Sequence, residues 1–396
     1  MTANAGSDVA RIQQIRAHRV APRWIFVRVA TDDGLHGWGE AIVPKRAQAV
    51  TGAVDDLAAN LAGEDASRIE ELWQRMRRGA FYRGGPVLST AAAAIEQALW
   101  DVKGKRHGLP VHEFLGGAVR ERVRTYAWIG GDRPDDVVAH AGARVAQGYT
   151  AVKMNATSEL DYIDRHDRID ATVERVGALR DAFGHDLDIA LDFHGRVHRA
   201  MAKSLLRALE EFDLMWVEEP LPPGHSDSLR EIVGVAGRTP IATGERLLSR
   251  WDYKRVLCEG VVDVIQPDVS LTGLFELEKL TRMAEAYDVA VAPHCPNGPI
   301  SLAASLQVDF CATNVIIQEQ SLGLHYNTGY GDLPEAEMLD YLTDPLPLTP
   351  RDGFLPRPVG PGLGVDIDEK AVGQGSVPWT LLDPTWRYPD GRIAEW

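Results

Sequence analysis

Short apolar runs alternate with longer amphipathic stretches from about residue 123 onward. Stretches such as 201–212 and 277–287 repeat apolar residues every three or four positions, the spacing of one helical face. Eight strand–helix units of this size close into a barrel of parallel strands, so the pattern predicts an α/β fold built on a TIM-like barrel. The runs that we expect to form strands are 123–129, 149–154, 187–192, 213–218, 240–243, 262–267, 288–293 and 314–319.

A doubly wound open sheet is the alternative arrangement for the same alternation of strands and helices. Sheets of that kind that bind dinucleotides carry a GxGxxG turn after an early strand. No such turn follows any early run of this chain, which weighs against the open sheet.

The first 120 residues have a different pattern, which mixes strands and helices. The runs 24–30 and 35–41 are joined by a tight turn at Asp33-Gly34, which is typical of a β-hairpin. Residues 90–107 have helical periodicity and stop at Gly108, a residue that commonly ends helices. We therefore expect an α+β domain over residues 1–122 and a barrel over residues 123–342.

The chain becomes rich in proline and glycine after residue 342, most densely over 344–364. This composition predicts irregular structure. We expect residues 343–396 to return to the N-terminal domain.

Charge and cysteine content narrow the possible partners and the compartment. The 396 residues carry a net charge of −15 with no basic run, which argues against nucleic acid as a partner. The three cysteines form no CxxC pair, which suits a reducing compartment. The chain shows no apolar signal segment and no run of 18 apolar residues. We expect a cytoplasmic protein without a membrane partner.

Acidic residues follow three successive predicted strands at intervals of about 26 residues, namely Asp192, Glu218 and Glu245. The C-terminal tips of parallel strands meet at one face of a barrel, so these carboxylates are expected to converge. Oxygen ligands without cysteine favour a hard cation, Mg²⁺ before Mn²⁺. A single such acid could instead cap a helix or pair with an arginine. Glu219 adjoins Glu218 and points to the opposite side of the strand, and spacing alone does not choose between them.

Two histidines stand at strand ends beside these acids. His194 lies two residues after Asp192, so both side chains share a face if the strand continues. His294 ends the seventh predicted strand, and Asp268 ends the sixth. A carboxylate on the neighbouring strand would orient the imidazole of His294 and raise its basicity, as in a general base. Either histidine could instead be a buried structural residue.

Further polar residues occupy the remaining strand ends: Lys153 and Asn155 at the second strand and Glu319 at the eighth. The C-terminal face of the strands holds the active site in barrel enzymes. Polar side chains at so many strand ends therefore indicate an enzyme that combines a metal with acid–base chemistry.

Several long motifs resemble the mandelate-racemase branch of the enolase superfamily, and most closely its sugar-acid dehydratases. The resemblance covers nearly the whole chain, with segments that include LDFHGRVH (191–198) and IQPDVSLTG (265–273). It is most specific in APHCPNGPISLAASLQVDF (292–310) and IQEQSLGLHYN (317–327). It implies a (β/α)₇β barrel with an N-terminal α+β capping domain completed by C-terminal residues, and assembly into a homo-oligomer.

The positions that match the family's metal ligands are Asp192, Glu218 and Glu245, which selects Glu218 over Glu219 and implies Mg²⁺ as the cofactor. His294 matches the general base of the family and His194 its general acid.

The same match implies supporting roles for three more residues. Asp268 resembles the partner of the general base, and Glu319 the residue that hydrogen-bonds the intermediate. Lys153 is placed to add a hydrogen bond to the substrate carboxylate.

The second strand favours elimination over racemisation. Racemases of this superfamily typically have the pattern Lys-x-Lys at this strand. This chain has Lys153-Met154-Asn155 instead, and Asn155 cannot take a proton. The resemblance implies dehydration of D-galactonate to 2-dehydro-3-deoxy-D-galactonate. Another aldonate, such as gluconate or fuconate, is the alternative substrate, and a non-catalytic member of the superfamily is a further alternative. Leu274 stands where the family pattern has a second glycine, and this difference bears on which sugar acid is preferred.

Overall fold

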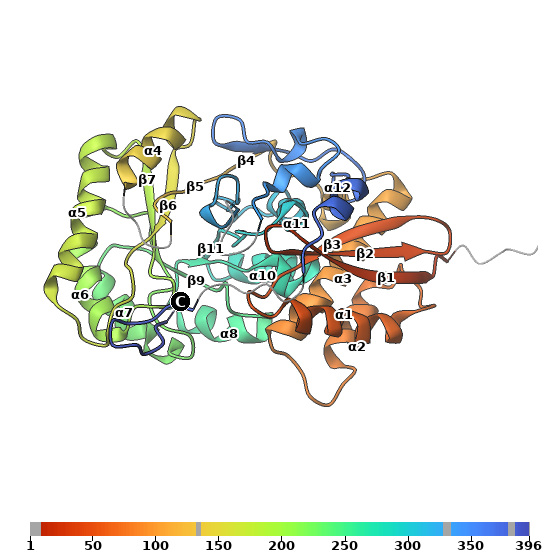
Figure 1. The fold of residues 1–396 in the computed structure, drawn as a ribbon, viewed down its shortest axis with the longest axis horizontal. Coiled ribbons are helices and arrows are strands. Elements are labelled where there is room, and N and C mark those ends of the chain that lie inside the picture. Colours follow the sequence, from red (N-terminus) through yellow and green to blue (C-terminus); the bar gives the residue numbers. More distant parts are fainter. Residues whose placement is uncertain (1–8, 132–135, 328–333, 379–384, 396) are drawn as a thin grey trace, which may run out of the picture.

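The computed structural model describes residues 9–131, 136–327, 334–378 and 385–395. The chain forms an N-terminal α+β unit beside a barrel of parallel strands, and the C-terminal segment runs over both (Figure 1). Within the described residues, no helix is both long and apolar enough to cross a bilayer.

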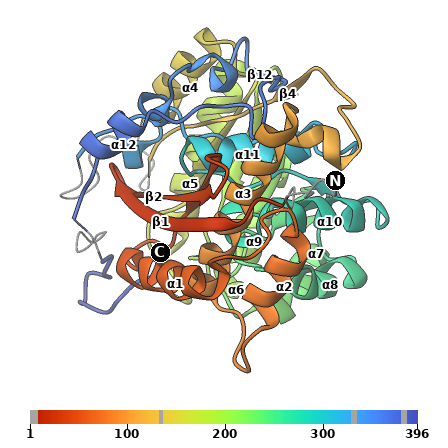
Figure 2. The ribbon, with the colours of Figure 1, turned by 90° about the vertical axis from the view of Figure 1, so that its right-hand side faces the viewer.

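The N-terminal unit is an antiparallel sheet in the order β1-β2-β3, and Figure 2 views this unit with the barrel behind it. The turn between β2 and β3 contains Gly34, whose φ of 89° favours glycine. The predicted hairpin and the predicted helix end at Gly108 are confirmed. The elements are β1 (Ile12–Val20), β2 (Trp24–Thr31), β3 (His36–Ala41), α1 (Ala47–Leu61), α2 (Ile69–Arg78) and α3 (Pro86–His107).

Helix α3 lies unusually close to strand β3. A Cβ atom added to Gly37 would stand 2.2 Å from the carbonyl oxygen of Ala98, and one added to Gly39 would stand 1.8 Å from that of Ala94. Only glycine on the strand and small residues on the helix permit this approach. The alanine-rich part of α3 is consequently buried on nearly all sides, between the sheet and the barrel.

The barrel contains a seven-stranded sheet in the order β11-β10-β9-β8-β7-β6-β5, in which every pair is parallel. Its strands are β5 (Ala127–Trp128), β6 (Ala151–Asn155), β7 (Asp188–Asp192), β8 (Trp216–Glu218), β9 (Ile241–Thr243), β10 (Val264–Ile265) and β11 (Ala290–Val291). The helices around it are α4 (Val137–Ala146), α5 (His166–Phe183), α6 (Arg199–Leu209), α7 (Leu229–Ala236), α8 (Arg250–Glu259), α9 (Val269–Thr272), α10 (Leu274–Glu285) and α11 (Pro299–Asp309).

The eighth apolar run, residues 314–319, closes the barrel without forming a regular strand. Val315 makes a parallel bridge with Val291 of β11, and Gln318 makes one with Thr125, just before β5. The expected regular strand is therefore reduced to two isolated bridges, but the predicted barrel architecture is confirmed. Inside the barrel, small and large side chains form one buried cluster of Tyr126, Ala151, Ala190, Trp216, Ala242, Val264, Ala292 and Ile317.

Two buried glutamates of the N-terminal unit reach the first turns of barrel helices. Glu40 of β3 accepts hydrogen bonds from the backbone nitrogens of Gly298 (2.6 Å) and Ser301 (3.0 Å) at the start of α11. Glu96 of α3 accepts from the backbone nitrogen of Leu274 (2.8 Å) at the start of α10. The first backbone N–H groups of a helix have no partner within the helix, so each carboxylate satisfies a helix end across the boundary between the units. Leu274 is itself fully buried at this seam.

The C-terminal segment contacts both the N-terminal unit and the barrel. Strand β12 (Phe354–Pro356) pairs with β4 (Arg122–Arg124). Gly375, directly after helix α12 (Glu369–Gln374), accepts a hydrogen bond from the backbone nitrogen of Ala21 at 2.9 Å. Residues 385–395 instead contact a barrel loop, where the hydroxyl of Tyr388 donates to the carbonyl oxygen of Leu160 at 2.8 Å. The short 3₁₀ helices of the chain are Val111–Leu115, Glu210–Phe212, Ser226–Ser228, His325–Asn327, Met338–Tyr341 and Leu346–Leu348.

Candidate active site

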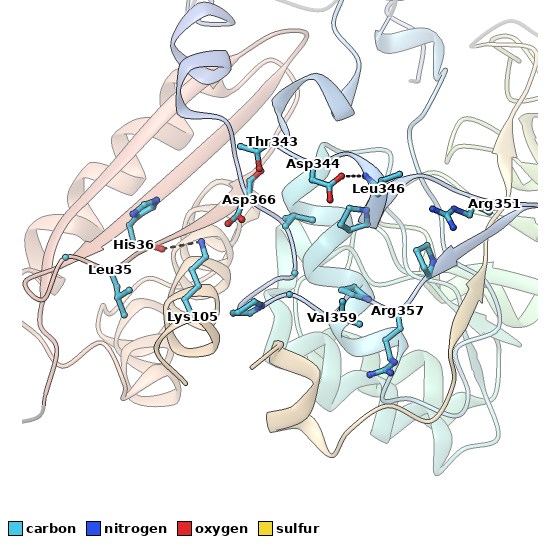
Figure 3. Close-up of a pocket in the computed structure, with 18 residues that line it drawn as sticks. Leu35, His36, Lys105, Thr343, Asp344, Leu346, Arg351, Arg357, Val359 and Asp366 are labelled. Carbon is cyan, nitrogen blue, oxygen red and sulfur yellow. Dashed lines mark hydrogen bonds between the residues drawn. The ribbon is translucent and has the colours of Figure 1, made fainter. Parts of the chain in front are cut away.

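A groove of about 800 Å³ lies between the β2–β3 turn and the C-terminal segment (Figure 3). Its Lys105 is already paired, because the Nζ atom lies 2.7 Å from Oδ2 of Asp101 and also contacts the carbonyl oxygen of His36. None of the acids or histidines at the strand ends lines this groove. The chemistry-bearing residues gather instead at the C-terminal ends of the barrel strands.

Three carboxylates converge at that end. Asp192 is the last residue of β7, Glu218 is the last residue of β8, and Glu245 lies two residues beyond β9. These strands are neighbours in the sheet, and Asp192 pairs directly with Glu218. All three side chains are buried, and one oxygen of each lies within 4.8 Å of the other two.

The charged groups in and around this triad favour the binding of a cation. Burial raises the pKa of Asp192 well above its usual range, and the neighbouring carboxylate of Glu218 raises it further. Nζ of Lys153 lies 2.6 Å from Glu218, and Nε of Arg246 lies 3.3 Å from Glu245. Buried carboxylates at this separation are stabilised by additional positive charge, so three oxygen donors in this geometry fit a divalent cation.

Glu218 and Glu219 point to different places. The Oε2 atom of Glu218 accepts hydrogen bonds from Nε1 of Trp216 at 3.0 Å and Nε2 of Gln266 at 2.7 Å, and its Oε1 atom accepts one from Nζ of Lys153 at 2.6 Å. Glu219 has a φ of 42°, which is rare for this residue type, and accepts a hydrogen bond from the backbone nitrogen of Gly244 at 3.1 Å. The structure brings Glu218, and not Glu219, into the triad.

His294 is surrounded by carboxylates. Its Nδ1 atom lies 2.8 Å from Oδ2 of Asp268, and its Nε2 atom lies 3.3 Å from Oε2 of Glu245. Asp268 is held in turn by the side-chain amide of Asn297, at 3.1 and 3.0 Å from its two oxygens. Burial lowers the pKa of His294, but Glu245, Glu319 and Asp268 outweigh burial and raise it to about 10. In the neutral ring, Asp268 keeps the hydrogen on Nδ1, so Nε2 presents its lone pair.

His194 has the opposite surroundings. It follows β7 in a left-handed conformation, with a φ of 54°, and its backbone nitrogen donates to Oδ1 of Asp192 at 2.5 Å. Nη2 of Arg196 lies 3.0 Å from Nδ1 of the ring. Nη2 of Arg246 donates to the backbone carbonyl of His194 at 2.9 Å. Two guanidinium groups therefore contact this one histidine.

Lys153 and Glu319 form a buried pair between β6 and the closing segment. The Nζ atom of Lys153 lies 3.1 Å from Oε1 of Glu319, in addition to its contact with Glu218. Glu319 also accepts hydrogen bonds from Nε1 of Trp128 (2.6 Å) and from the backbone nitrogen of Cys295 (2.8 Å). These contacts hold an ammonium group and a carboxylate in fixed positions beside the triad.

Asn155, two residues beyond Lys153, is also buried at the end of β6. Its Nδ2 atom donates to the carbonyl oxygen of Gly131 at 3.3 Å, and its Oδ1 atom has no partner among the described residues. A buried amide oxygen of this kind is available to accept a hydrogen bond from a hydroxyl group.

Several residues that hold the site together were not predicted from the sequence. Trp216 and Gln266 each stand two positions before a strand-end acid, and residues at this spacing share a strand face. The alternation that singled out His194 after Asp192 could therefore have found them. Arg196 and Arg246 carry no such signal, because their contacts depend on a backbone turn and on a distant segment.

Comparison with known families decides the relationship of the chain. Residues 7–116 match the mandelate racemase / muconate lactonizing enzyme N-terminal domain, and residues 136–371 match the enolase C-terminal domain-like family. The chain belongs to the mandelate racemase branch of the enolase superfamily. Membership of this superfamily implies a divalent metal, and the triad is a cluster that could hold one.

Similar members of the superfamily are known over the full length of the chain. A D-galactonate dehydratase of Ralstonia nicotianae is 47% identical over 98% of this chain and 100% of its own length. A D-galactonate dehydratase of Pectobacterium atrosepticum is 44% identical over the same shares. Among solved structures, a putative dehydratase from Zymomonas mobilis is 32% identical, with a TM-score of 0.85 over 93% of this chain and 98% of its own. A putative galactarate dehydratase from Agrobacterium radiobacter is 30% identical, with a TM-score of 0.85 over 97% and 100%.

Proposed function

We propose that this enolase-superfamily member is a Mg²⁺-dependent D-galactonate dehydratase that forms 2-dehydro-3-deoxy-D-galactonate. The observation that carries the proposal is the convergence of three buried carboxylates beside two histidines with opposite hydrogen-bonding partners. Relatives named for this activity, 44–47% identical over the whole chain, support the choice of substrate.

Asp192, Glu218 and Glu245 would hold the cation. A bound divalent cation supplies positive charge that stabilises the two negative charges of the substrate carboxyl group when the C2 proton leaves. Lys153 and Glu319 lie beside this position and would add hydrogen bonds to the same group. Because Lys153 is buried between two carboxylates, it remains charged, and its pKa is raised well above the usual range although burial alone lowers it.

His294 would take the proton from C2. Its Nε2 atom is the nitrogen that faces the triad, and Asp268 stabilises the resulting imidazolium through Nδ1. Asn155 stands at the end of β6, where a racemase would carry a second base. With a single base the site removes the C2 proton from one face only, which favours elimination.

His194 would complete the elimination by donating a proton to the C3 hydroxyl group. The C3–O bond then breaks, water leaves, and the electron pair released at C2 forms the C2–C3 double bond. The resulting enol tautomerises to the 2-keto-3-deoxy acid. One proton is taken from C2 and one is delivered to the departing oxygen, so the reaction needs no further co-reactant.

Incubation with D-galactonate, D-gluconate and fuconate in separate reactions tests this proposal, with NMR detection of 2-keto-3-deoxy products. We expect rapid dehydration of D-galactonate, loss of activity in EDTA, and recovery with Mg²⁺. Interconversion of 2-epimers without a keto product would overturn the reaction. Dehydration of gluconate but not galactonate would keep the reaction and overturn the substrate.

The proposal extends to a cytoplasmic homo-oligomer. Cys295 and Cys311 are buried and unpaired, which suits a reducing compartment. Phe81 and Tyr82 are 92% and 85% exposed, and large aromatic side chains of this kind are common where subunits meet. Sedimentation or light scattering of the purified protein tests the assembly.

A further inference from the structure

The hydrogen bond between Arg196 and His194 fixes which nitrogen of the imidazole carries hydrogen. Nη2 of Arg196 lies 3.0 Å from Nδ1 of His194. A guanidinium group has five N–H donors and no acceptor, so in this contact Nδ1 must be the acceptor. A neutral imidazole that accepts at Nδ1 carries its hydrogen on Nε2.

The guanidinium group is held in place by its surroundings. Arg196 is only 3% exposed, and its Nη1 atom donates to the carbonyl oxygen of Thr157 at 3.3 Å, in the loop after β6. The backbone nitrogen of Arg196 donates to the carbonyl oxygen of Phe193 at 3.0 Å. The turn that this bond closes brings the side chains of residues 194 and 196 together. A buried group with these contacts loses little further freedom when it orients the ring.

A second arginine fixes the backbone of the same histidine. Arg246 donates to the carbonyl oxygen of His194, and a Cβ atom added at Gly195 would lie 2.2 Å from Nη1 of Arg246. Gly195 has a φ of 59° and leaves room for this guanidinium group. Arg246 therefore holds the backbone of His194, and Arg196 holds the ring at its Nδ1 atom.

We infer that Arg196 is the positioning residue that presents the Nε2 hydrogen of His194 as the proton donor of this site. When that hydrogen passes to the C3 oxygen, the imidazolate that forms is stabilised by the guanidinium group at Nδ1. Asp268 accepts from Nδ1 of His294 and leaves Nε2 as a lone pair, whereas Arg196 donates to Nδ1 of His194 and leaves the hydrogen on Nε2. The assignment of His194 as donor to the C3 hydroxyl rests on the proposed function. The tautomer does not, because it follows from the contact alone.

The tautomer is measurable without any substrate. In protein with ¹⁵N-labelled histidine at pH 8 with Mg²⁺, the His194 signals are identified by their loss in His194→Asn. We expect Nδ1 without hydrogen and Nε2 with hydrogen in the parent protein, and a mixture of tautomers in Arg196→Met. A hydrogen on Nδ1 in the parent protein overturns the inference, whatever the enzyme's substrate is.

The catalytic consequence appears in how a substrate molecule is partitioned. In deuterated buffer with D-galactonate, we compare exchange at C2 in the recovered substrate with formation of the keto acid. For Arg196→Met we expect dehydration to fall by roughly 10- to 100-fold with little change in KM, so that the ratio of exchange to dehydration rises at least about 10-fold. Arg196→Lys retains a donor and should recover part of the loss.

Arg175→Met is the matched control. Arg175 is a partly buried arginine of α5 that donates to the carbonyl oxygen of Ala156 at 2.7 Å, next to the Thr157 contact of Arg196. We expect its exchange-to-dehydration ratio to equal that of the parent enzyme. An unchanged ratio in Arg196→Met, or a lysine variant no better than methionine, overturns the positioning role. A parent enzyme that neither exchanges nor dehydrates D-galactonate refutes the proposed function, and the tautomer measurement then still decides the inference.

Discussion

The two sides of the site present the same side chain in opposite electrostatic surroundings. The ring of His294 contacts Asp268 and Glu245, whereas the ring of His194 contacts Arg196 and the backbone carbonyl of His194 accepts from Arg246. In a neutral imidazole one ring nitrogen donates and the other accepts. A partner that accepts from Nδ1 makes Nε2 an acceptor, and a partner that donates to Nδ1 makes Nε2 a donor. The hydrogen-bonding partner, and not the residue type, therefore determines which histidine is suited to act as the base and which as the acid.

The two sides also differ in how the backbone creates them. His294 makes an isolated parallel bridge with Asp268 just beyond the ends of β10 and β11, so its orientation follows from the register of these two neighbouring strands. His194 sits in a left-handed turn with Gly195, and its orientation depends on side chains that meet across that turn. A change in sheet register would disturb the base, whereas a change in one turn would disturb only the acid.

The largest effect is expected where both sides share a dependence, at the metal-binding triad. Asp192→Asn should weaken Mg²⁺ binding and reduce turnover by at least roughly 10³-fold, because the charge that stabilises the developing anion is lost for both histidines. Calorimetric titration with Mg²⁺ and an assay of keto-acid formation measure the two effects. Asp188→Asn, at the half-buried start of the same strand, is the control. Full turnover by metal-free enzyme would contradict the prediction.

The next effect separates the two histidines. His294→Asn should lose C2 exchange and dehydration together, by roughly 10²–10⁴-fold, because nothing else removes the proton. His194→Asn should lose dehydration but retain exchange, because the base is intact. NMR in deuterated buffer measures both reactions in one sample. Exchange at the parent rate in His294→Asn would show that another group is the base.

A smaller effect on activity is expected at Asp268, the partner of the base His294. Asp268→Asn keeps a polar side chain of the same size beside Nδ1 of His294 but removes its charge. We expect exchange and dehydration to fall in proportion, by roughly 10–100-fold. This outcome is the reverse of the altered ratio expected when the partner of the acid is removed. A changed ratio in Asp268→Asn would mean that the two sides are not separable.

The smallest effect is expected from the turn itself. Gly195→Ala places a side chain at a positive φ and against Nη1 of Arg246, so dehydration should fall about 10-fold with exchange retained. Gly260→Ala is the control, because Gly260 has a φ of 60° with nothing within 4 Å of the added Cβ. Both variants should lose about 1 kcal/mol of unfolding free energy from backbone strain, measured by denaturant titration. Equal activities in the two variants would remove Arg246 from the account.

The difference between the strand-end backbone at His294 and the turn at His194 explains which parts of the fold and site could be predicted from the sequence. The barrel, the triad and the pair of Asp268 and His294 repeat at the length of a strand–helix unit, so spacing alone indicated their convergence. The contacts of Arg196 and Arg246 were not predictable, because they arise from a left-handed turn and from a side chain about 50 residues away. The eighth run likewise has a strand's composition, but in the described residues it forms two isolated bridges instead of a regular strand.

The two glutamates that cross from the N-terminal unit bear on how such enzymes diversify. Glu40 and Glu96 complete the first turns of α11 and α10, so each unit contains backbone groups that only the other unit satisfies. A capping unit transplanted from a relative would need a carboxylate at both points, at matching distances, or it would leave buried amide groups without partners. Exchange of whole caps is therefore a narrow evolutionary route to new substrates. Changes in individual cap loops leave these two joints intact.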